Sequence, residues 1–182
     1  MSRLTPEQEK MVEVWGMHTA CEFATKNVHD TMETMSGNPH VNHVPVMTGG
    51  TGTEDVIDFY STWFIPCQPP DVELEIVSCT VGSDAVVDEL IFKFTHTVDM
   101  PWMLPGIPPT GKKVEIPLVV IVGFEDGKIA SEHIYWDQAS VLVQVGLLDS
   151  GSLPVAGVET ARKVLDPSLP SNSLIKNASA RR

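Results

Sequence analysis

Cysteine and long apolar runs are scarce in this sequence, and each scarcity excludes a class of protein. The 182 residues include an odd number of cysteines without metal-ligand spacing, namely Cys21, Cys67 and Cys79. This usage predicts a reduced, cytoplasmic protein rather than a secreted one held by disulfides. The longest apolar runs, such as residues 118–122, are far too short to span a bilayer. The N-terminus is polar and lacks the apolar stretch of a signal peptide, so we expect no membrane partner.

Positive charge is scarce as well. The 12 lysines and arginines are outnumbered by 24 aspartates and glutamates, which gives a formal net charge of -12. A chain this acidic repels phosphate backbones, so we expect no nucleic-acid partner. The hydrophobic fraction of 42% is ordinary for a globular protein, and the length suits one domain with a sizeable core and an appended tail.

Motifs for cofactors and metals are missing too. The loop Gly49–Gly52 precedes a predicted helix but lacks the Walker lysine and the dinucleotide fingerprint, so it is interpreted as a turn. No serine lies in a nucleophile-elbow sequence. The histidines that might suggest a metal site match no strong ligand motif: His29, His40, His43 and His133. The sequence therefore predicts neither a cofactor nor a metal.

The chain opens with a well-marked helix. Thr5 can cap it, Pro6 suits its first turn, and Gln8 completes a capping-box pattern. An apolar stripe then recurs at helical spacing: Met11, Trp15, His18 and Cys21 with Glu22. Most of this stripe is expected to be core, although His18 and Glu22 are polar members of it.

Further short elements follow before the pattern changes. A second helix is predicted over 28–35, ending at the turn signal of residues 36–39, and a short extended piece over 41–47. Thr53 is the expected cap of a third helix that runs to Phe64. Its predicted buried face consists of Val56, Phe59, Tyr60 and Trp63.

From residue 72 onward the periodicity becomes two, which is typical of strands. Strands are predicted near 72–80, 86–98, 114–124 and 128–137. The second of these places His96 on its apolar face, toward the core. The loop of residues 100–109 is unusually apolar and is expected to cover a pocket or a partner. Helices followed by antiparallel strands favour an α+β fold, a curved antiparallel sheet around helices with an internal pocket.

The end of the chain divides at about residue 148. A last helix is expected from 138 to 148, and residues 149–182 carry several prolines and are interpreted as a tail. We therefore predict a domain over 1–148 and a tail over 149–182 that packs on this domain or on a neighbouring subunit.

The turn at 124–128 sets the register of the last hairpin. A three-residue loop with Gly127 in the left-handed conformation would pair Val122 with Ala130 and Val120 with Glu132. The even-numbered residues of strand 114–124 are all apolar and must face inward, and their partners face inward with them. The inward set is Glu132, Ile134 and Trp136, and the outward set is His133, Tyr135 and Asp137. A two-residue Asp126-Gly127 loop would reverse this assignment.

Glu132 is the most informative residue under that register. A carboxylate among apolar side chains has a raised pKa unless it is paired, and such a group can act as a general acid or base. His96, on the neighbouring inward face, could pair with it or share its proton. The alternative is a buried Glu–His pair with a purely structural role.

The segment Asp126–Asp137, which contains Glu132-His133-Ile134-Tyr135-Trp136-Asp137, resembles the last hairpin of SnoaL-like polyketide cyclases, a family of the nuclear-transport-factor-2-like superfamily. The order of elements over about residues 5–148 resembles this family as well. The resemblance implies a cone-shaped sheet around a cavity, usually in a homodimer. It also implies a catalytic aspartate on the last strand, at the position that Ile134 occupies here. We expect Glu132, two residues earlier on the same face, to substitute for it.

The same resemblance suggests the remaining site residues. His43 matches a position where these families often place a polar pocket residue, although a structural or surface histidine is an equal alternative. From their residue types, the expected pocket walls are Trp136, Trp102, Tyr60, Met103 and Ile134, with plain core as the alternative for the two tryptophans and Met103. If the register were reversed, the catalytic groups would be Asp137 and His133 with Tyr135.

Three functions are compatible with these features. The first is a cofactor-independent cyclase, isomerase, hydratase or dehydratase acting on a small hydrophobic, carbonyl or polyketide-like molecule, with Glu132, His96 and His43 as its polar groups. The second is a module that binds such a molecule without turnover. The third is an interaction domain whose cone is filled with side chains.

Overall fold

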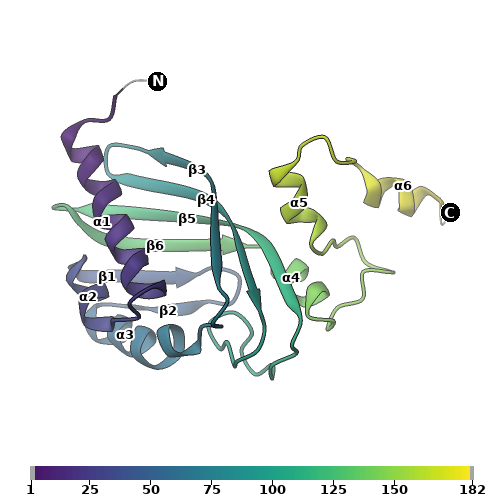
Figure 1. Ribbon diagram of the computed structural model, residues 1–182, viewed down its shortest axis with the longest axis horizontal. Helices are drawn as coiled ribbons and strands as arrows, with labels where there is room; N and C mark the ends of the chain where they lie inside the picture. The colour runs from purple at the N-terminus through teal and green to yellow at the C-terminus, as the bar shows by residue number, and fades with distance from the viewer. Residues whose placement is uncertain (1–2, 181–182) are drawn as a thin grey trace.

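The computed structural model describes residues 3–180 and consists of a six-stranded curved sheet with helices on its concave face (Figure 1). The strands are β1 (Met35–His43), β2 (Thr48–Thr51), β3 (Glu73–Val81), β4 (Ala85–Thr95), β5 (Lys113–Glu125) and β6 (Lys128–Trp136), in the spatial order β2-β1-β6-β5-β4-β3. Only the β1–β6 pair is parallel among these described strands. The sheet is not closed, and the predicted α+β class is confirmed.

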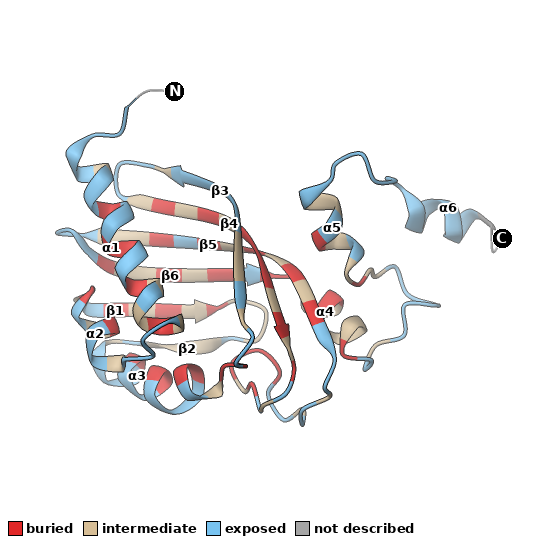
Figure 2. Ribbon diagram, in the orientation of Figure 1, coloured by how far each residue is buried: buried red, intermediate tan, exposed pale blue. Residues whose placement is uncertain are grey.

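Helix α1 (Pro6–Phe23) lies across the concave face and begins as its sequence predicts. The Thr5 hydroxyl accepts a hydrogen bond from the Gln8 backbone, and the Gln8 side chain accepts one from the Thr5 backbone, at 3.3 and 3.0 Å. This capping box satisfies two backbone donors that the helix itself leaves free. The buried side of α1 faces the sheet (Figure 2) and consists of Met11, Val14, Trp15, His18 and Glu22.

The expected turn at residues 36–39 is wrong. Helix α2 (Val28–Glu33) ends early, and Met35–His43 forms β1 instead. The strand pairs with β6 at Met35 and again from His40, with a register shift between them. Gly37 and Pro39 lie in this irregular stretch, where a strand tolerates residues that would otherwise interrupt a ladder.

The third helix differs from its prediction in two respects. Gly52, not Thr53, is the N-cap of α3 (Thr53–Asp58), and Thr53 donates its hydroxyl proton to the Gly37 carbonyl. The helix then widens into a π-helical turn over Phe59–Phe64. The wider turn buries Tyr60 and Phe64, whereas Trp63, predicted to be buried, has 49% of its surface exposed.

The β5–β6 hairpin has a two-residue turn, not the expected three-residue loop. Asp126 and Gly127 both have positive φ angles, 50° and 74°, as this tight turn requires. Glu125 then pairs with Lys128, but a bulge follows, and beyond it Val122 pairs with Glu132. The predicted pairing of Val120 with Glu132 is therefore wrong by two residues.

The predicted facing of these side chains nevertheless holds. A two-residue turn alone would have turned Glu132 outward, but the bulge adds one residue to β6 and reverses the faces again. Glu132, Ile134 and Trp136 are buried on the concave side, whereas Tyr135 and Asp137 are exposed.

The apolar loop of residues 100–109 folds into the core. Met100, Trp102, Met103 and Leu104 are almost completely buried. The Trp102 ring packs against Phe64 and His43, with ring centroids 5.0 and 5.3 Å apart. The loop therefore contributes its apolar side chains to the core, and its predicted role as the cover of a pocket or a partner stays a prediction.

The C-terminal segment packs partly on the domain. Helix α4 (Gln138–Gln144) is followed by α5 (Glu159–Leu165), which contacts β5, and the Ser140 hydroxyl donates to the Gly157 carbonyl at 2.9 Å. Helix α6 (Ser173–Ala180) extends away from the rest of the chain (Figure 1), and its residues 173–179 are exposed. The boundary at 148 and the homodimer stay predictions. Within residues 3–180, no helix has the length and apolar character needed to cross a membrane.

Candidate active site

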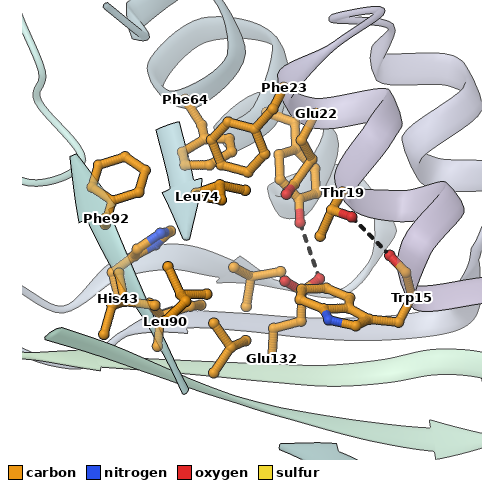
Figure 3. A pocket seen from close by; sticks show the side chains of 15 residues that line it. Trp15, Thr19, Glu22, Phe23, His43, Phe64, Leu74, Leu90, Phe92 and Glu132 are labelled. Atoms are coloured by element: carbon orange, nitrogen blue, oxygen red, sulfur yellow. Dashed lines mark hydrogen bonds between the residues drawn. The ribbon is translucent and has the colours of Figure 1, made fainter. Parts of the chain in front are cut away.

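A small cavity lies between α1, the π-helical turn and the concave face of the sheet (Figure 3). Its free volume is about 60 Å³, which is room for a few water molecules or a small chemical group. The residues that line it are Trp15, Thr19, Glu22, Phe23, Val41, His43, Tyr60, Phe64, Leu74, Leu90, Phe92, Leu118, Val120, Glu132 and Ile134. Polar groups are few in this wall, and they are concentrated near α1.

Glu132 projects from β6 into this cavity and is 3% exposed. Its Oε1 accepts a hydrogen bond from the Tyr60 hydroxyl at 3.2 Å and lies 3.1 Å from Nε2 of His18. Val41 and Val122 are its partners on the two neighbouring strands. The carboxylate is thus removed from bulk water and held by two polar contacts.

His18 connects Glu132 to a second carboxylate. Its Nε2 also lies 3.2 Å from Oε1 of Glu22, one helical turn along α1, and the imidazole is completely buried. Nδ1 lies 2.6 Å from the Thr34 hydroxyl, which itself donates to the Thr31 carbonyl. Because that hydroxyl proton is already used, Nδ1 must be the donor to Thr34. We name His18, Glu22, Glu132 and Tyr60 the polar cluster.

The charges of the polar cluster follow from its geometry. Burial by itself would lower the pKa of His18, but the attraction of Glu132 and Glu22 outweighs it and raises that pKa to about 10. Burial raises the pKa of Glu22 above its ordinary value. For Glu132, burial is outweighed by the His18 charge and by the hydrogen bonds from His18 and Tyr60, so its pKa is lowered. The geometry therefore favours an imidazolium and an ionised Glu132, and it shifts Glu22 toward its protonated form.

Trp15 orients His18 from the sheet side. The indole stacks on the imidazole, with ring centroids 5.6 Å apart and planes inclined by 20°. Its Nε1 donates to Oδ2 of the buried Asp88 on β4 at 2.6 Å. This bond ties the helix that carries His18 and Glu22 to the sheet that carries Glu132.

His43 lines another part of the cavity wall, among aromatic rings. Phe59, Phe64, Trp102 and Trp136 all have ring centroids within 5.8 Å of its own. Its Nδ1 is buried without a hydrogen-bond partner among the described residues. Burial lowers the pKa of His43 to about 4, so this imidazole is neutral at neutral pH.

His96 does not meet Glu132, contrary to the expectation from its inward facing. It is fully buried, but its Nδ1 lies 3.2 Å from the Thr110 hydroxyl, and it does not line the cavity. Glu132 is level with Val122 on β5 and Val86 on β4. His96 follows Val86 by ten residues, which is about 30 Å of strand.

The other predicted residues are divided between wall, core and surface. Tyr60 and Ile134 line the cavity, whereas Trp102, Met103 and Trp136 pack in the core outside its lining. The alternative catalytic set lies away from the cavity. His133 packs edge-on against His40, Tyr135 is 41% exposed, and Asp137 caps α4 by accepting from the Ala139 backbone.

The sequence reasoning missed the role of His18, Glu22 and Thr34. The signal for the first two was present, because a histidine and a glutamate four residues apart share the buried stripe of α1. Nothing in the sequence connects that stripe to Glu132, which is more than a hundred residues away.

The polar cluster also has the composition of a cation site. Ligand atoms of His18, Glu22 and Glu132 all lie within 4.8 Å of one another, and imidazole with carboxylates is a donor set that divalent metals accept. In the structure as described, however, the two His18 contacts at 3.1 and 3.2 Å are hydrogen-bonded ion pairs.

Comparison with known proteins identifies the family. The family model of SnoaL-like polyketide cyclases matches residues 8–145, whereas no curated protein matches the sequence. One solved structure of this fold, assigned as a SnoaL-like polyketide cyclase from Jannaschia sp. CCS1, is 20% identical, with a TM-score of 0.62 over 82% of this chain and 100% of that one.

Two further solved structures share the fold. AclR from Streptomyces galilaeus, assigned as a hydroxylase, is 18% identical, with a TM-score of 0.60 over 96% of this chain and 92% of AclR. A protein from Acidithiobacillus ferrooxidans, assigned as a polyketide cyclase, is 20% identical, with a TM-score of 0.56 over 80% of this chain and 97% of that one. With the matched segment covering most of its length, this chain belongs to the SnoaL-like polyketide cyclase family.

Proposed function

We propose that this protein is a cofactor-independent enzyme of the SnoaL-like type that moves a proton on a small, largely hydrophobic carbonyl or polyketide-like compound. The observation that carries the proposal is the buried Glu132 carboxylate, which lines an apolar cavity and is held there by His18 and Tyr60. Membership in a family of cyclases supports an enzyme over a structural protein.

The polar cluster supplies both an acid and a base. Two carboxyl groups whose surroundings push their pKa values apart are the usual pattern of acid/base catalysis. Here Glu132, with a lowered pKa, is the base, and Glu22, with a raised pKa, is the acid. Both side chains line the cavity, so both can touch a bound substrate. His18 is a positioning residue, because it holds the two carboxyl groups through one ring nitrogen.

In this proposal, His43 forms a hydrogen bond with an oxygen atom of the substrate. Its imidazole lines the cavity beside the aromatic rings. A neutral imidazole there can hydrogen-bond a carbonyl while Glu132 takes a proton from the adjacent carbon. Cyclisation, isomerisation, hydration and dehydration all use such a pair of groups.

The cavity's volume limits what enters it. About 60 Å³ is well below the roughly 300–1,000 Å³ of pockets for drug-sized ligands. A polyketide-sized substrate therefore requires the wall to open. The half-buried side chains of the lining, Thr19, Phe23 and Leu74, mark where α1 and β3 could separate.

Hydrogen–deuterium exchange tests the proposal without knowledge of the product. The full chain is incubated in D2O with a panel of small ketones and aldehydes, and NMR follows the loss of the protons next to each carbonyl. Glu132→Gln should lower the exchange rate about 100-fold or more, because the base is gone. Glu125→Gln, which changes an exposed carboxylate on β5, is the matched control.

The same assay decides between the proposal and its alternatives. Unchanged exchange in Glu132→Gln would exclude Glu132 as the base. Compounds that bind without exchange would identify a binding module instead. If no compound of the panel binds or exchanges, the domain functions through interactions, and the enzyme proposal falls.

A further inference from the structure

We infer that the cavity binds a small organic cation, an ammonium group, between the two carboxyl groups of the polar cluster and the surrounding aromatic rings. The inference deepens the proposed function by naming the class of its substrate, and it rests on that proposal only for the choice of cavity. The argument uses the charge, the rings and the polar groups of the cavity wall.

The cavity wall has two acidic side chains and no lysine or arginine to match them. Glu22 and Glu132 both line it, and neither lysine nor arginine is among its fifteen lining residues. Behind the wall, a single imidazole nitrogen of His18 lies at 3.2 and 3.1 Å from the two carboxyl groups. The single positive charge of His18 is thus shared by Glu22 and Glu132. A positively charged ligand in the cavity would give the second carboxyl group a partner of its own. A cationic ligand is therefore favoured over an anionic one there.

Aromatic rings form much of the remaining wall. Figure 3 shows Phe23, Phe64 and Phe92 grouped on the side opposite Glu132, with Trp15 beside that carboxylate. The cavity lining contains these four residues and Tyr60. Ring faces attract a desolvated ammonium, and aromatic walls are how proteins recognise methylated ammonium groups. A hydrated metal ion would gain nothing from such a wall, so the rings favour an organic cation.

His43 adds a second contact at a defined place. It is 4% exposed and lines the same cavity, and its Nδ1 has no partner among the described residues. On β1 it is level with Ile134, two residues along β6 from Glu132, which is about 7 Å. The inferred ligand therefore has a hydroxyl or carbonyl oxygen a few bonds from its ammonium group.

Binding of a cation should release a proton. Burial raises the pKa of Glu22 and so favours its protonated form in the empty cavity. An ammonium placed beside it favours the ionised form, so the proton leaves as the ligand enters. The affinity for the cation should therefore increase as the pH rises toward the pKa of Glu22.

Calorimetry on the full chain tests the inference with choline as the probe. The control ligand is 3,3-dimethyl-1-butanol, which has the same shape with carbon in place of the charged nitrogen. Choline should bind at least 10-fold more tightly than this alcohol, and buffers of different ionisation enthalpy should reveal proton release. Glu22→Gln should weaken choline binding about 10-fold without changing the affinity for the alcohol, whereas Glu125→Gln should change neither.

The other outcomes overturn the inference, the proposed function or both. Equal binding of choline and the alcohol would show that shape alone decides, and the absence of choline binding would exclude a cation site of this size. Binding of Zn²⁺ or Mg²⁺ to the polar cluster in the absence of choline binding would show that a metal is the occupant. Carbonyl exchange that depends on Glu132 without choline binding would overturn this inference alone. Choline binding with unchanged exchange in Glu132→Gln would overturn only the proposed function.

Discussion

Two histidines of this protein are almost completely buried, but one is positively charged at neutral pH and the other is neutral. His18 belongs to the polar cluster, and its pKa is raised to about 10. His43 lies among aromatic rings along the same cavity, and burial lowers its pKa to about 4. Burial acts on both in the same direction, toward the neutral form. The difference comes from two carboxyl groups at hydrogen-bond distance from His18, and it teaches that a histidine's partners, not its depth, decide its role.

Removal of the His18 charge, which distinguishes the two histidines, should have the largest effect on stability. His18→Leu leaves the buried Glu132 and Glu22 without their cation, which should lower the free energy of unfolding by about 3–5 kcal/mol. Urea denaturation measures the loss. Glu22→Gln is the control and should cost less than about 1.5 kcal/mol, because the His18–Glu132 pair remains and the amide oxygen can still accept a hydrogen bond from His18. A loss below 1 kcal/mol in His18→Leu would contradict the ion-paired cluster.

The His43 side of the comparison predicts a pH dependence. Because the folded pKa of His43, about 4, lies below the ordinary histidine pKa of 6.5, the unfolded chain takes up the proton first as the pH falls. The free energy of unfolding should therefore decrease by about 3 kcal/mol as the pH falls from 6.5 to 4, because of His43 alone. Above pH 6.5 His43 should make no such contribution. His43→Phe should remove this component, as measured by urea denaturation at a series of pH values. Parallel curves for the two proteins would refute a neutral His43.

The smallest effect concerns the orientation of His18. Thr34→Val keeps the shape of the side chain but removes the hydroxyl that accepts from Nδ1 at 2.6 Å. The buried N–H then lacks a partner, at a cost of about 1–2 kcal/mol. Thr34→Ser retains the hydroxyl and should retain most of the stability. The same loss in both variants would mean that packing of the threonine methyl group, not the hydrogen bond, is what matters.

The order of elements could be predicted because each one has a local signal. The capping box at Thr5 and Gln8 marks the start of α1, and alternating apolar residues mark β4, β5 and β6. β1 could not be predicted in the same way, because Ser36–Pro39 has the local chemistry of a turn. Parallel pairing with β6, a distant part of the chain, makes a strand of it.

The hairpin shows how a correct conclusion can rest on a wrong register. The sequence indicates a turn at Asp126-Gly127, but its length and the bulge beside it are separate events. Each one reverses the facing of Glu132, and together they cancel. The even-numbered apolar face of β5 was the stronger guide, because burying that face is what holds the register in place.

The sequence by itself determined which side chains are buried: the stripe of α1 with His18 and Glu22, and the inner face of β6 with Glu132. The periodicity of apolar residues is a local property of the sequence, so it indicates the apolar face of a helix or strand without reference to the rest of the chain. Only the tertiary structure decided that Glu132 meets His18 and not His96. Both histidines face inward, and the choice between them depends on where α1 crosses the sheet and how far along β4 each contact falls.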